Sequence, residues 1–230
     1  VVIAVAWHIV RRCGIDPRAM FSLPSPAVRL FASAVLIGML CRIVSWAVIT
    51  LSGSFGWLEA AAAAPPRAFG IGWACPSPFV MVVSTVTWFL LVPISEELVH
   101  RGVVLTKLAQ HGMFPALAGS AIVFVAFHQP EGLVTAFVAG LLLGYQYWVT
   151  RNLWVPIVTH ATYDGLLIID TLCLKLTWNP PRDAIPAWDV GIPALVVLVA
   201  ALGGITGLLA TLRTGVLQPR PAFPDADVSA

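Results

Sequence analysis

Long apolar runs recur along this chain, and they constrain its fold more than any other feature. Such runs occupy residues 30–51, 79–94, 114–128, 133–150, 153–174 and 192–212. An α-helix of about 20 apolar residues crosses a bilayer, because a helix satisfies its own backbone polar groups in lipid. The composition agrees, since 59% of the residues are hydrophobic and 10% are charged, whereas soluble domains have about 25% charged residues. The chain is therefore predicted to be an all-α polytopic membrane protein.

One bundle of helices accounts for most of the chain. The 230 residues allow about seven transmembrane spans, within a range of roughly six to eight, at about 20 residues per span. Residues 1–10 are expected to form a short or truncated first span. Residues 79–110 are expected to form one long helix, which Pro93 would kink. We assign residues 1–212 to a single transmembrane domain, and residues 213–230, which contain several prolines and aspartates, to a disordered cytoplasmic tail.

The positions of the basic residues predict the orientation, because cytoplasmic connections are enriched in Lys and Arg. The connections expected on one side carry Arg67, Lys175 and Arg182. The other side carries nine basic residues: Arg11, Arg12, Arg18, Arg29, Arg101, Lys107, Arg151, Arg213 and Arg220. We therefore expect a multi-pass protein of the cell membrane, of the bacterial inner or plasma membrane type, with a cytoplasmic C-terminus.

The cysteines and the net charge exclude other classes. Cys13, Cys41, Cys75 and Cys173 show no CxxC spacing and lie in or beside apolar runs, so we expect unpaired small apolar residues and no disulfide framework. The net charge is +2, and the basic residues do not form a cluster. Nucleic acid is therefore excluded as a partner.

A charged segment follows directly on one apolar run. Residues 95–101 read SEELVHR, immediately after the run at 79–94. Two later apolar segments contain His128 and His160, and Asp164 lies four residues after His160. Ionisable residues inside membrane helices are costly, and they usually face a bundle interior or cavity and indicate function. The sequence therefore predicts a site within the bundle.

Helical geometry predicts that these side chains meet. Counted from the expected cytoplasmic helix ends, Glu96, His128 and His160 lie roughly 16, 21 and 13 Å deep, at about 1.5 Å per residue. Residues four apart share a helix face, and three pairs have this spacing: Glu97 with Arg101, Phe124 with His128, and His160 with Asp164. The other histidines are expected to be solvated or interfacial: His8, His100 and His111.

The charged segment and the two histidine segments resemble three sequence motifs of a known protein family. Residues 96–101 form an EExxxR motif, residues 124–128 form FxxxH, and His160 with Asp164 resembles HxxxN/D. In this order the chain resembles the CAAX-protease and bacteriocin-processing (CPBP) family of intramembrane proteases, related to the type II CAAX prenyl endopeptidase. The resemblance covers about residues 79–170. Asp164 departs from the family pattern, in which Asn is more common.

The resemblance implies hydrolysis of a peptide bond within the membrane. Glu96 would act as general base on a water molecule that also contacts His128. Glu97, paired with Arg101, would hold the helix and orient Glu96. The implied partners are a membrane-associated protein or peptide substrate and the lipid bilayer, while the oligomeric state is left open.

The motif residues are compatible with a metal-free mechanism and with a zinc-dependent one. His160 and Asp164 would stabilise the oxyanion or the departing amine. The family is often described as metalloproteases, and Glu96, His128 and His160 would then be the ligands of a zinc ion. The HExxH arrangement is absent from the sequence, and a metal-free mechanism uses the same residues. The metal-free version is favoured.

Other functions remain compatible with the same residues. Ser120 does not lie in a GxSG turn, and no GxGD motif is present, which argues against rhomboid-like and presenilin-like chemistry. A transporter or proton relay would also need buried carboxylates and histidines, although no internal repeat is evident. A catalytically silent immunity or scaffold protein on the same fold is the third interpretation. Conceivable substrates include prenylated CAAX tails, bacteriocin leaders and C-terminal sorting anchors.

Overall fold

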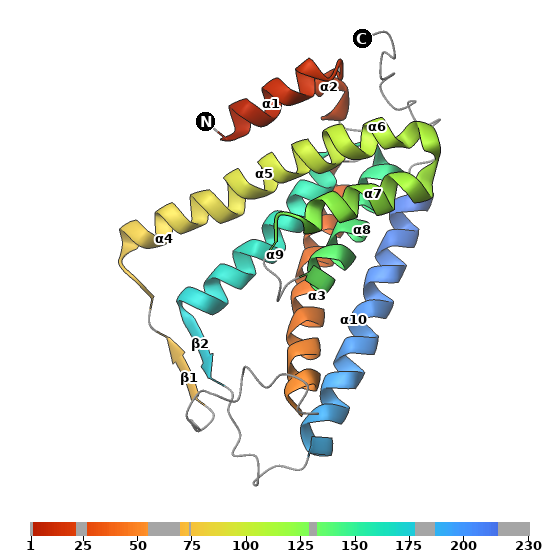
Figure 1. Ribbon diagram of the computed structural model, residues 1–230. Coiled ribbons are helices and arrows are strands. Elements are labelled where there is room, and N and C mark those ends of the chain that lie inside the picture. Colours follow the sequence, from red (N-terminus) through yellow and green to blue (C-terminus); the bar gives the residue numbers. More distant parts are fainter. Residues whose placement is uncertain are drawn as a thin grey trace.

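The computed structural model is a bundle of helices (Figure 1). It describes residues 2–21, 27–54, 70–73, 75–128, 133–177 and 187–215. The main elements are α1 (Val2–Arg12), α2 (Pro17–Met20), α3 (Ala27–Ser54), β1 (Gly70–Trp73), α4 (Pro78–Thr85), η2 (Val86–Leu91), α5 (Val92–Glu97), η3 (Leu98–Leu105), α6 (Thr106–Leu108), η4 (Ala109–His111), α7 (Met113–Val125), α8 (Leu133–Thr150), α9 (Trp154–Leu172), β2 (Leu174–Thr177) and α10 (Ala187–Gly215). Most of the predicted tail, from residue 216 on, lies outside the described residues, and α10 continues through Arg213 into its beginning.

The predicted bundle of membrane helices is confirmed, apart from two short strands, while the number of spans stays a prediction. Among the described residues, four helices are long and apolar enough to cross a membrane: Val28–Val48, Pro78–His111, Leu133–Thr150 and Gly191–Arg213. Helix α7 is apolar but shorter. Helix α9 has 19 residues and carries the acidic residues Asp164 and Asp170. The chain is therefore a multi-pass membrane protein.

Helix α1 is not a full span in the described residues. It has 11 residues, which is about 16 Å of helix, whereas the hydrocarbon core is about 30 Å thick. It packs against η3 and α5, running alongside them in Figure 1. Its buried residues Ala6 and Val10 join a core cluster with Leu98 and Leu105 of η3. Helix α1 therefore covers the segment that carries the charged motif.

The long helix predicted at residues 79–110 is confirmed, because the chain is helical from Pro78 to His111. Within it, the π-helical segments η2 and η3 flank α5. Pro93 comes directly after η2, and a proline cannot donate a backbone hydrogen bond to the preceding turn. Just after it, the Ser95 hydroxyl donates to the carbonyls of Leu91 and Val92, at 2.8 and 3.0 Å. The wider π turns thus accommodate Pro93 just before the two adjacent glutamates.

Helix α9 is held in place by close contact with α3, which also packs against α10. A Cβ atom on Gly38 would lie 2.6 Å from the Thr159 carbonyl oxygen and 2.7 Å from the Thr162 Cβ. The Thr159 hydroxyl donates to the Ala34 carbonyl at 3.0 Å and accepts from the Gln146 amide at 2.9 Å. These bonds join α3, α8 and α9, so His160, which follows Thr159, has a fixed position.

We expect Gly38→Ala to separate α3 from α9. The new methyl group would meet the backbone of Thr159, which cannot move aside as a flexible side chain could, and overpacking of this kind costs about 1–3 kcal/mol. Thermal unfolding of the detergent-purified protein measures the loss. Gly203→Ala in α10 is the matched control, because a Cβ atom there meets nothing within 4 Å. Equal stability of the two variants would contradict the close packing.

A GxxxG spacing on α8, formed by Gly140 and Gly144, brings that helix close to α7. A Cβ atom on Gly140 would lie 3.0 Å from the Cα of Ala121, and one on Gly144 would lie 3.1 Å from a methyl carbon of Leu117. Small residues allow helices to approach closely in membranes. The approach also makes the Gly140 carbonyl available to a buried side chain of η3, which belongs to the site.

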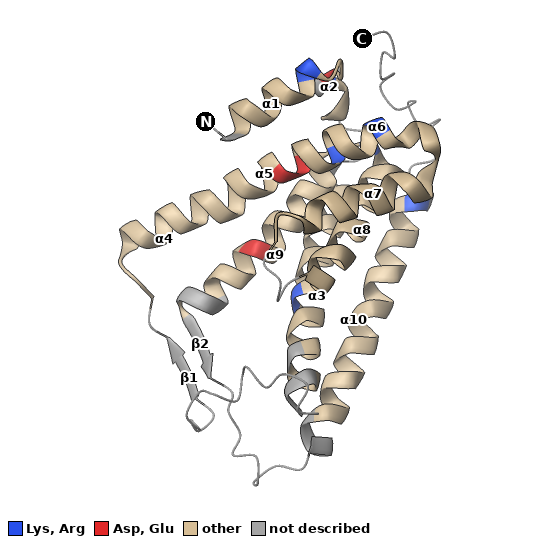
Figure 2. Ribbon diagram, viewed as in Figure 1, with Lys and Arg blue, Asp and Glu red and all other residues tan. Residues whose placement is uncertain are grey.

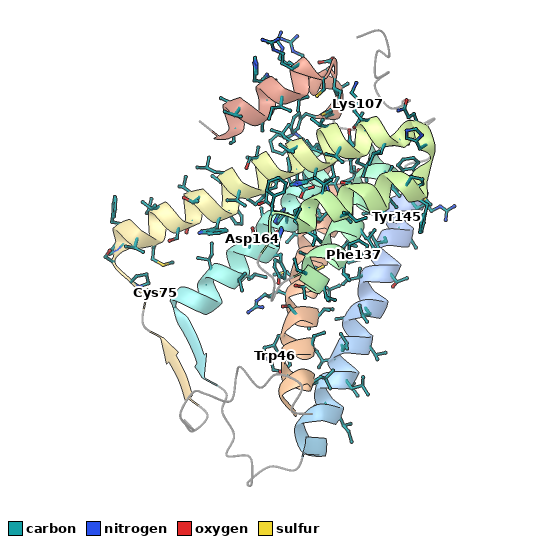
Figure 3. All side chains as sticks on the ribbon, viewed as in Figure 1. Trp46, Cys75, Lys107, Phe137, Tyr145 and Asp164 are labelled. Atoms are coloured by element: carbon teal, nitrogen blue, oxygen red, sulfur yellow. A yellow bond between two sulfur atoms is a disulfide. The ribbon has the colours of Figure 1, made fainter. Side chains whose placement is uncertain are left out.

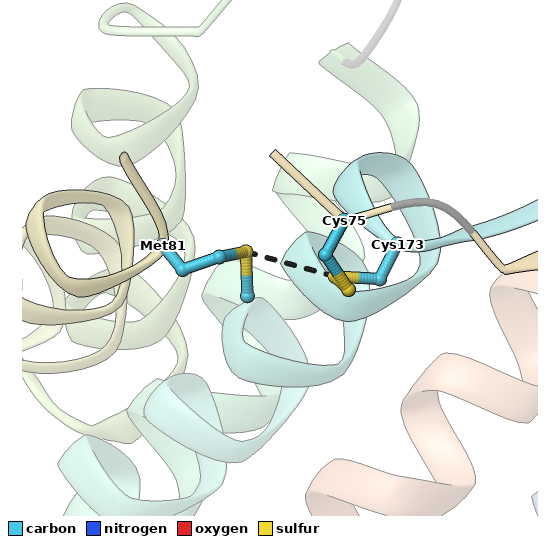
Figure 4. Close-up of a disulfide and its surroundings, with 3 residues drawn as sticks. All are labelled: Cys75, Met81 and Cys173. Atoms are coloured by element: carbon cyan, nitrogen blue, oxygen red, sulfur yellow. Dashed lines mark hydrogen bonds between the residues drawn. A yellow bond between two sulfur atoms is a disulfide. The ribbon is translucent and has the colours of Figure 1, made fainter. Parts of the chain in front are cut away.

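Two features correct the sequence analysis at one end of the bundle. Strands β1 and β2 pair antiparallel, with Gly70 opposite Thr177 and Trp73 opposite Leu174, so the fold is not purely helical. A disulfide joins Cys75 to Cys173, as Figure 4 shows, and the expectation that these cysteines are unpaired is wrong. They lie 98 residues apart, and the strand pairing brings them together. Two further cysteines are free, as expected: Cys13 and Cys41.

The charged residues are distributed unevenly (Figure 2). Most Lys and Arg residues gather at the end of the bundle formed by α1, α2, α6 and the last turn of α10, although one lies partway along α3. Strands β1 and β2 lie at the other end (Figure 1). This asymmetry agrees with the charge count in the sequence. Arg101 is an exception, because it lies buried in the bundle and not in a connection.

Candidate active site

Three segments that are distant in the sequence supply the side chains of the predicted site. Helix α5 and segment η3 carry Glu96, Glu97 and Arg101, the end of α7 carries Phe124 and is followed by His128, and α9 carries His160 and Asp164. Helix α9 packs against α5, and α7 packs against η3. Figure 2 shows the acidic residues of α5 and α9 near the centre of the molecule, and Figure 3 shows Asp164 on the part of α9 that runs beneath α5.

Glu97 and Arg101 form a fully buried ion pair. Arg101 Nη1 donates to Glu97 Oε1 at 2.9 Å, and both side chains have no exposed surface. Arg101 Nη2 donates to the Gly140 carbonyl of α8 at 3.0 Å, and the guanidinium lies 4.7 Å from the centroid of the Phe124 ring. The predicted pair of residues four apart is therefore present, and it ties η3 to α7 and α8.

His160 lies next to all three acidic side chains of the site. Its Nδ1 atom donates to Glu97 Oε1 at 2.9 Å, which orients the ring. Its Nε2 atom lies 3.4 Å from Asp164 Oδ2 and 3.9 Å from Glu96 Oε2. Glu96 is 28% exposed and Asp164 is 15% exposed. The Nε2 atom thus faces the two carboxyl groups that a ligand can reach, while Glu97 lies behind the ring.

His128 completes the predicted set. It lies just beyond the end of α7, where its Nδ1 atom donates to the Phe124 carbonyl at 2.8 Å, so its Nε2 atom is left for other contacts. The two rings of this FxxxH pair lie 4.4 Å apart. Glu96 has both His128 and His160 among its electrostatic neighbours. The structure therefore brings the six predicted site residues into one cluster.

Phe124 is the shared contact of the aromatic residues around this cluster. Besides His128 and Arg101, its ring contacts His160, with the centroids 5.9 Å apart, and His100, with the centroids 5.0 Å apart. The ring is itself 1% exposed. Phe124 therefore fixes the separation between α7, α9 and η3.

The sequence analysis missed His100, which it placed in solvent or at the interface. The ring is 3% exposed, and its Nδ1 atom donates to the Glu96 carbonyl at 2.7 Å. Ser120 of α7 donates to the carbonyl of His100 at 2.9 Å. The signal was its position within the charged segment, four residues after Glu96 on the same helix face. The other two histidines outside the motifs are exposed, as expected: His8 and His111.

The donor atoms do not form a zinc site in this arrangement. Among the described residues, no three His, Cys, Asp or Glu side chains are placed to hold one metal ion. His128 and His160 each use Nδ1 in a hydrogen bond, and each has Nε2 as the remaining ligand atom. We therefore derive no step of the chemistry through a metal.

A comparison with known families matches the segment that carries the predicted site residues. Residues 78–166 match the family described as Rce1-like, type II CAAX prenyl endopeptidase Rce1-like. The match begins at the first residue of α4 and contains all six predicted site residues. No curated protein and no solved structure matches the chain. The family match confirms the resemblance inferred from the motifs.

Proposed function

Because residues 78–166 match the family described as type II CAAX prenyl endopeptidase Rce1-like, we propose that this chain is an intramembrane endopeptidase. Its substrate would be a membrane-associated protein or peptide. The observation that carries the proposal is the convergence on His160, whose Nε2 atom lies 3.9 Å from Glu96 Oε2 and 3.4 Å from Asp164 Oδ2. A carboxylate that water can reach, beside an oriented imidazole, is suited to peptide hydrolysis.

Glu96 is proposed as the general base. Its carboxylate is the more exposed of the two adjacent glutamates, at 28% against 0%, so it can hold a water molecule at the site. His128 lies among its electrostatic neighbours and would provide the second contact to that water. The water oxygen would attack the substrate carbonyl carbon while its proton passes to Glu96.

His160 and Asp164 are proposed to stabilise the oxyanion that this attack creates. Glu97 accepts the Nδ1 proton of His160, so only Nε2 is directed toward the substrate. With both ring nitrogens protonated, the His160 imidazolium, beside Asp164 at 3.4 Å, would donate its Nε2–H to the negatively charged oxygen. Glu96 would then return its proton to the departing amine as the C–N bond breaks, which leaves a carboxylic acid and a free amine.

The test of this function is a comparison of protein termini in membranes. We would express the wild-type chain, the Glu96→Gln variant and an empty vector, and identify by mass spectrometry the new N- and C-termini of membrane proteins. We expect specific termini that require both the chain and the Glu96 carboxylate. Identical termini in the three samples would favour a transporter, a proton relay or a catalytically silent binding protein.

We expect the hydrolysis to be metal-free. The purified protein should then contain less than one zinc ion per chain, and its activity should survive a membrane-permeant chelator. Inductively coupled plasma mass spectrometry measures the first quantity, and the initial cleavage rate measures the second. One tightly bound zinc ion whose removal and return switch the activity off and on would show that Glu96, His128 and His160 are ligands instead.

The proposed enzyme is one transmembrane domain, residues 1–212, in a cell membrane. The gathering of Lys and Arg at one end of the bundle (Figure 2) supports an orientation in which that end, with the C-terminus, is cytoplasmic. The strands β1 and β2 would then lie on the opposite side of the membrane.

A further inference from the structure

The disulfide joins the two helical segments that carry the acidic residues of the site. Cys75 lies between β1 and the start of α4, and Cys173 is the C-terminal cap of α9. The continuous helix that begins at α4 carries Glu96 and Glu97, and α9 carries His160 and Asp164. Figure 4 shows the disulfide at the end of α9, with Met81 of α4 beside it, where its Sδ atom lies 3.6 Å from Cys173 Sγ.

The loop that the disulfide closes coincides with the functional part of the chain. The cysteines are 98 residues apart, and all six predicted site residues lie between them. The matched family segment, residues 78–166, lies within the same loop. One covalent bond therefore closes the segment that contains the site.

The two joined segments are also in close contact between the disulfide and the site. Helix α9 packs against α4, η2 and α5. A Cβ atom on Gly165 would lie 2.6 Å from Cδ2 of Phe89 in η2. The two segments are therefore in contact here, and an added methyl group would require the Phe89 ring to move. Because Gly165 follows Asp164 directly, a shift of α9 away from η2 would also move Asp164 and His160 away from Glu96.

The location of the disulfide indicates its compartment. Disulfides persist in oxidising environments outside the cytosol and are rare within it. This one lies beside β1 and β2, at the end of the bundle away from the gathered Lys and Arg residues (Figure 2). Two independent features, the disulfide and the basic residues, therefore assign the two ends to opposite sides of the membrane.

We infer that the Cys75–Cys173 disulfide forms on the non-cytoplasmic side and holds the two site-bearing helices in register, so that proteolysis depends on its oxidation. The dependence of proteolysis on this oxidation rests on the proposed function, whereas the assignment of the disulfide to the non-cytoplasmic side does not. Formation transfers two electrons and two protons from the cysteine thiols to the disulfide of a protein thiol oxidant by disulfide exchange, which leaves the oxidant as a dithiol. Reduction by a dithiol reverses this step, and the dithiol becomes a cyclic disulfide.

The exposure of the two cysteines determines which sulfur atom a reducing agent attacks first. Cys75 is exposed, whereas Cys173 is 2% exposed. A dithiol would therefore attack the Cys75 sulfur first, form a mixed disulfide there, and release Cys173 as a thiolate. The second thiol of the reagent would then free Cys75.

The activity test uses the folded wild-type protein, so it does not depend on the folding of a variant. Reduction with dithiothreitol in mild detergent should lower the initial cleavage rate by about tenfold to a hundredfold, since a displacement of 1 Å can cost about 10²-fold. Reoxidation with glutathione disulfide should restore the rate. Cys41→Ala, which removes a free cysteine, should respond as the wild type does, whereas Cys75→Ala/Cys173→Ala should be slow and insensitive to reductant. An unchanged wild-type rate, with complete reduction verified by mass spectrometry, would overturn the dependence on oxidation.

The compartment test does not require activity. Cells are quenched with acid, free thiols are blocked with a maleimide, and the peptides that contain Cys75 and Cys173 are measured by mass spectrometry. We expect the disulfide in normal cells and free thiols in cells that lack their extracytoplasmic thiol oxidase. In those cells a membrane-impermeant maleimide should label Cys75 from outside. Free thiols at both positions in normal cells would overturn the inference, and an inactive protein with an intact disulfide would count against the proposed function instead.

Discussion

Glu96→Gln is expected to abolish peptide-bond hydrolysis while the protein folds and inserts normally. The amide has nearly the shape of the carboxylate but cannot accept a proton from water, and loss of a general base costs about 10²–10⁴-fold in rate. The side chain is partly exposed, and its Oε2 atom lies 3.9 Å from Nε2 of His160, so the substitution breaks no close hydrogen bond to that ring. The initial rate on a substrate identified by the terminus comparison measures the effect.

The variant Glu96→Asp provides the matched control for charge. It keeps the carboxylate but withdraws it by one methylene, so we expect a measurable residual rate, above that of the Gln variant. The abundance and thermal unfolding of both variants should equal those of the wild type. A Glu96→Gln protein with the wild-type rate would refute the assignment of Glu96 as the general base. An unstable Glu96→Gln protein would show that Glu96 stabilises the fold.

Helical spacing predicted the local pairs of the site correctly. Arg101 lies one helical turn after Glu97, and Asp164 lies one turn after His160. In each case the geometry of a single helix determines the contact, because side chains four residues apart lie on one face. That Glu96, His128 and His160 lie at a similar depth in the membrane stays a prediction, although the structure places them in one cluster.

Contacts between segments could not be predicted from spacing in the same way. The bond from His160 to Glu97 joins residues 63 apart, and it shows that Glu97 orients His160, whereas the motif indicated only its pair with Arg101. His100 looked like a residue at a helix end, because the sequence does not show that α7 covers that face of η3. Its burial depends on Phe124 and Ser120, which lie in a different helix.

The disulfide was missed for a related reason. Cys75 and Cys173 border four-residue strands, which are too short to give a clear alternation of polar and apolar residues. Without the strand pairing, two cysteines beside apolar runs have no evident partner. The π-helical segments were also not predicted, although Pro93 marked the place where the regular hydrogen bonding of the helix had to change.

The buried pair of Glu97 and Arg101 gives the largest expected effect on stability. Glu97→Gln leaves the Arg101 guanidinium, which has no exposed surface, without its carboxylate. Loss of one partner of a buried ion pair costs about 3–5 kcal/mol. Arg101→Met should cost less, because the Glu97 carboxylate keeps His160 at 2.9 Å. Thermal unfolding of each variant in detergent measures these losses, with Arg29→Met, at an exposed position of α3, as the control for removal of a cation.

The double variant Glu97→Gln/Arg101→Met separates the stabilising role of Glu97 from its role in orienting His160. It buries no unpaired charge, so most of the lost stability should return, as is common when a buried ion pair is replaced as a whole. The rate should stay low, by up to about 10⁴-fold, the loss seen when the histidine-orienting carboxylate of a serine protease becomes an amide. An amide can accept from Nδ1 of His160, but it carries no negative charge to hold the ring as an Nε2–H donor. If stability and rate return together, Glu97 acts through the fold alone, and another group must orient His160.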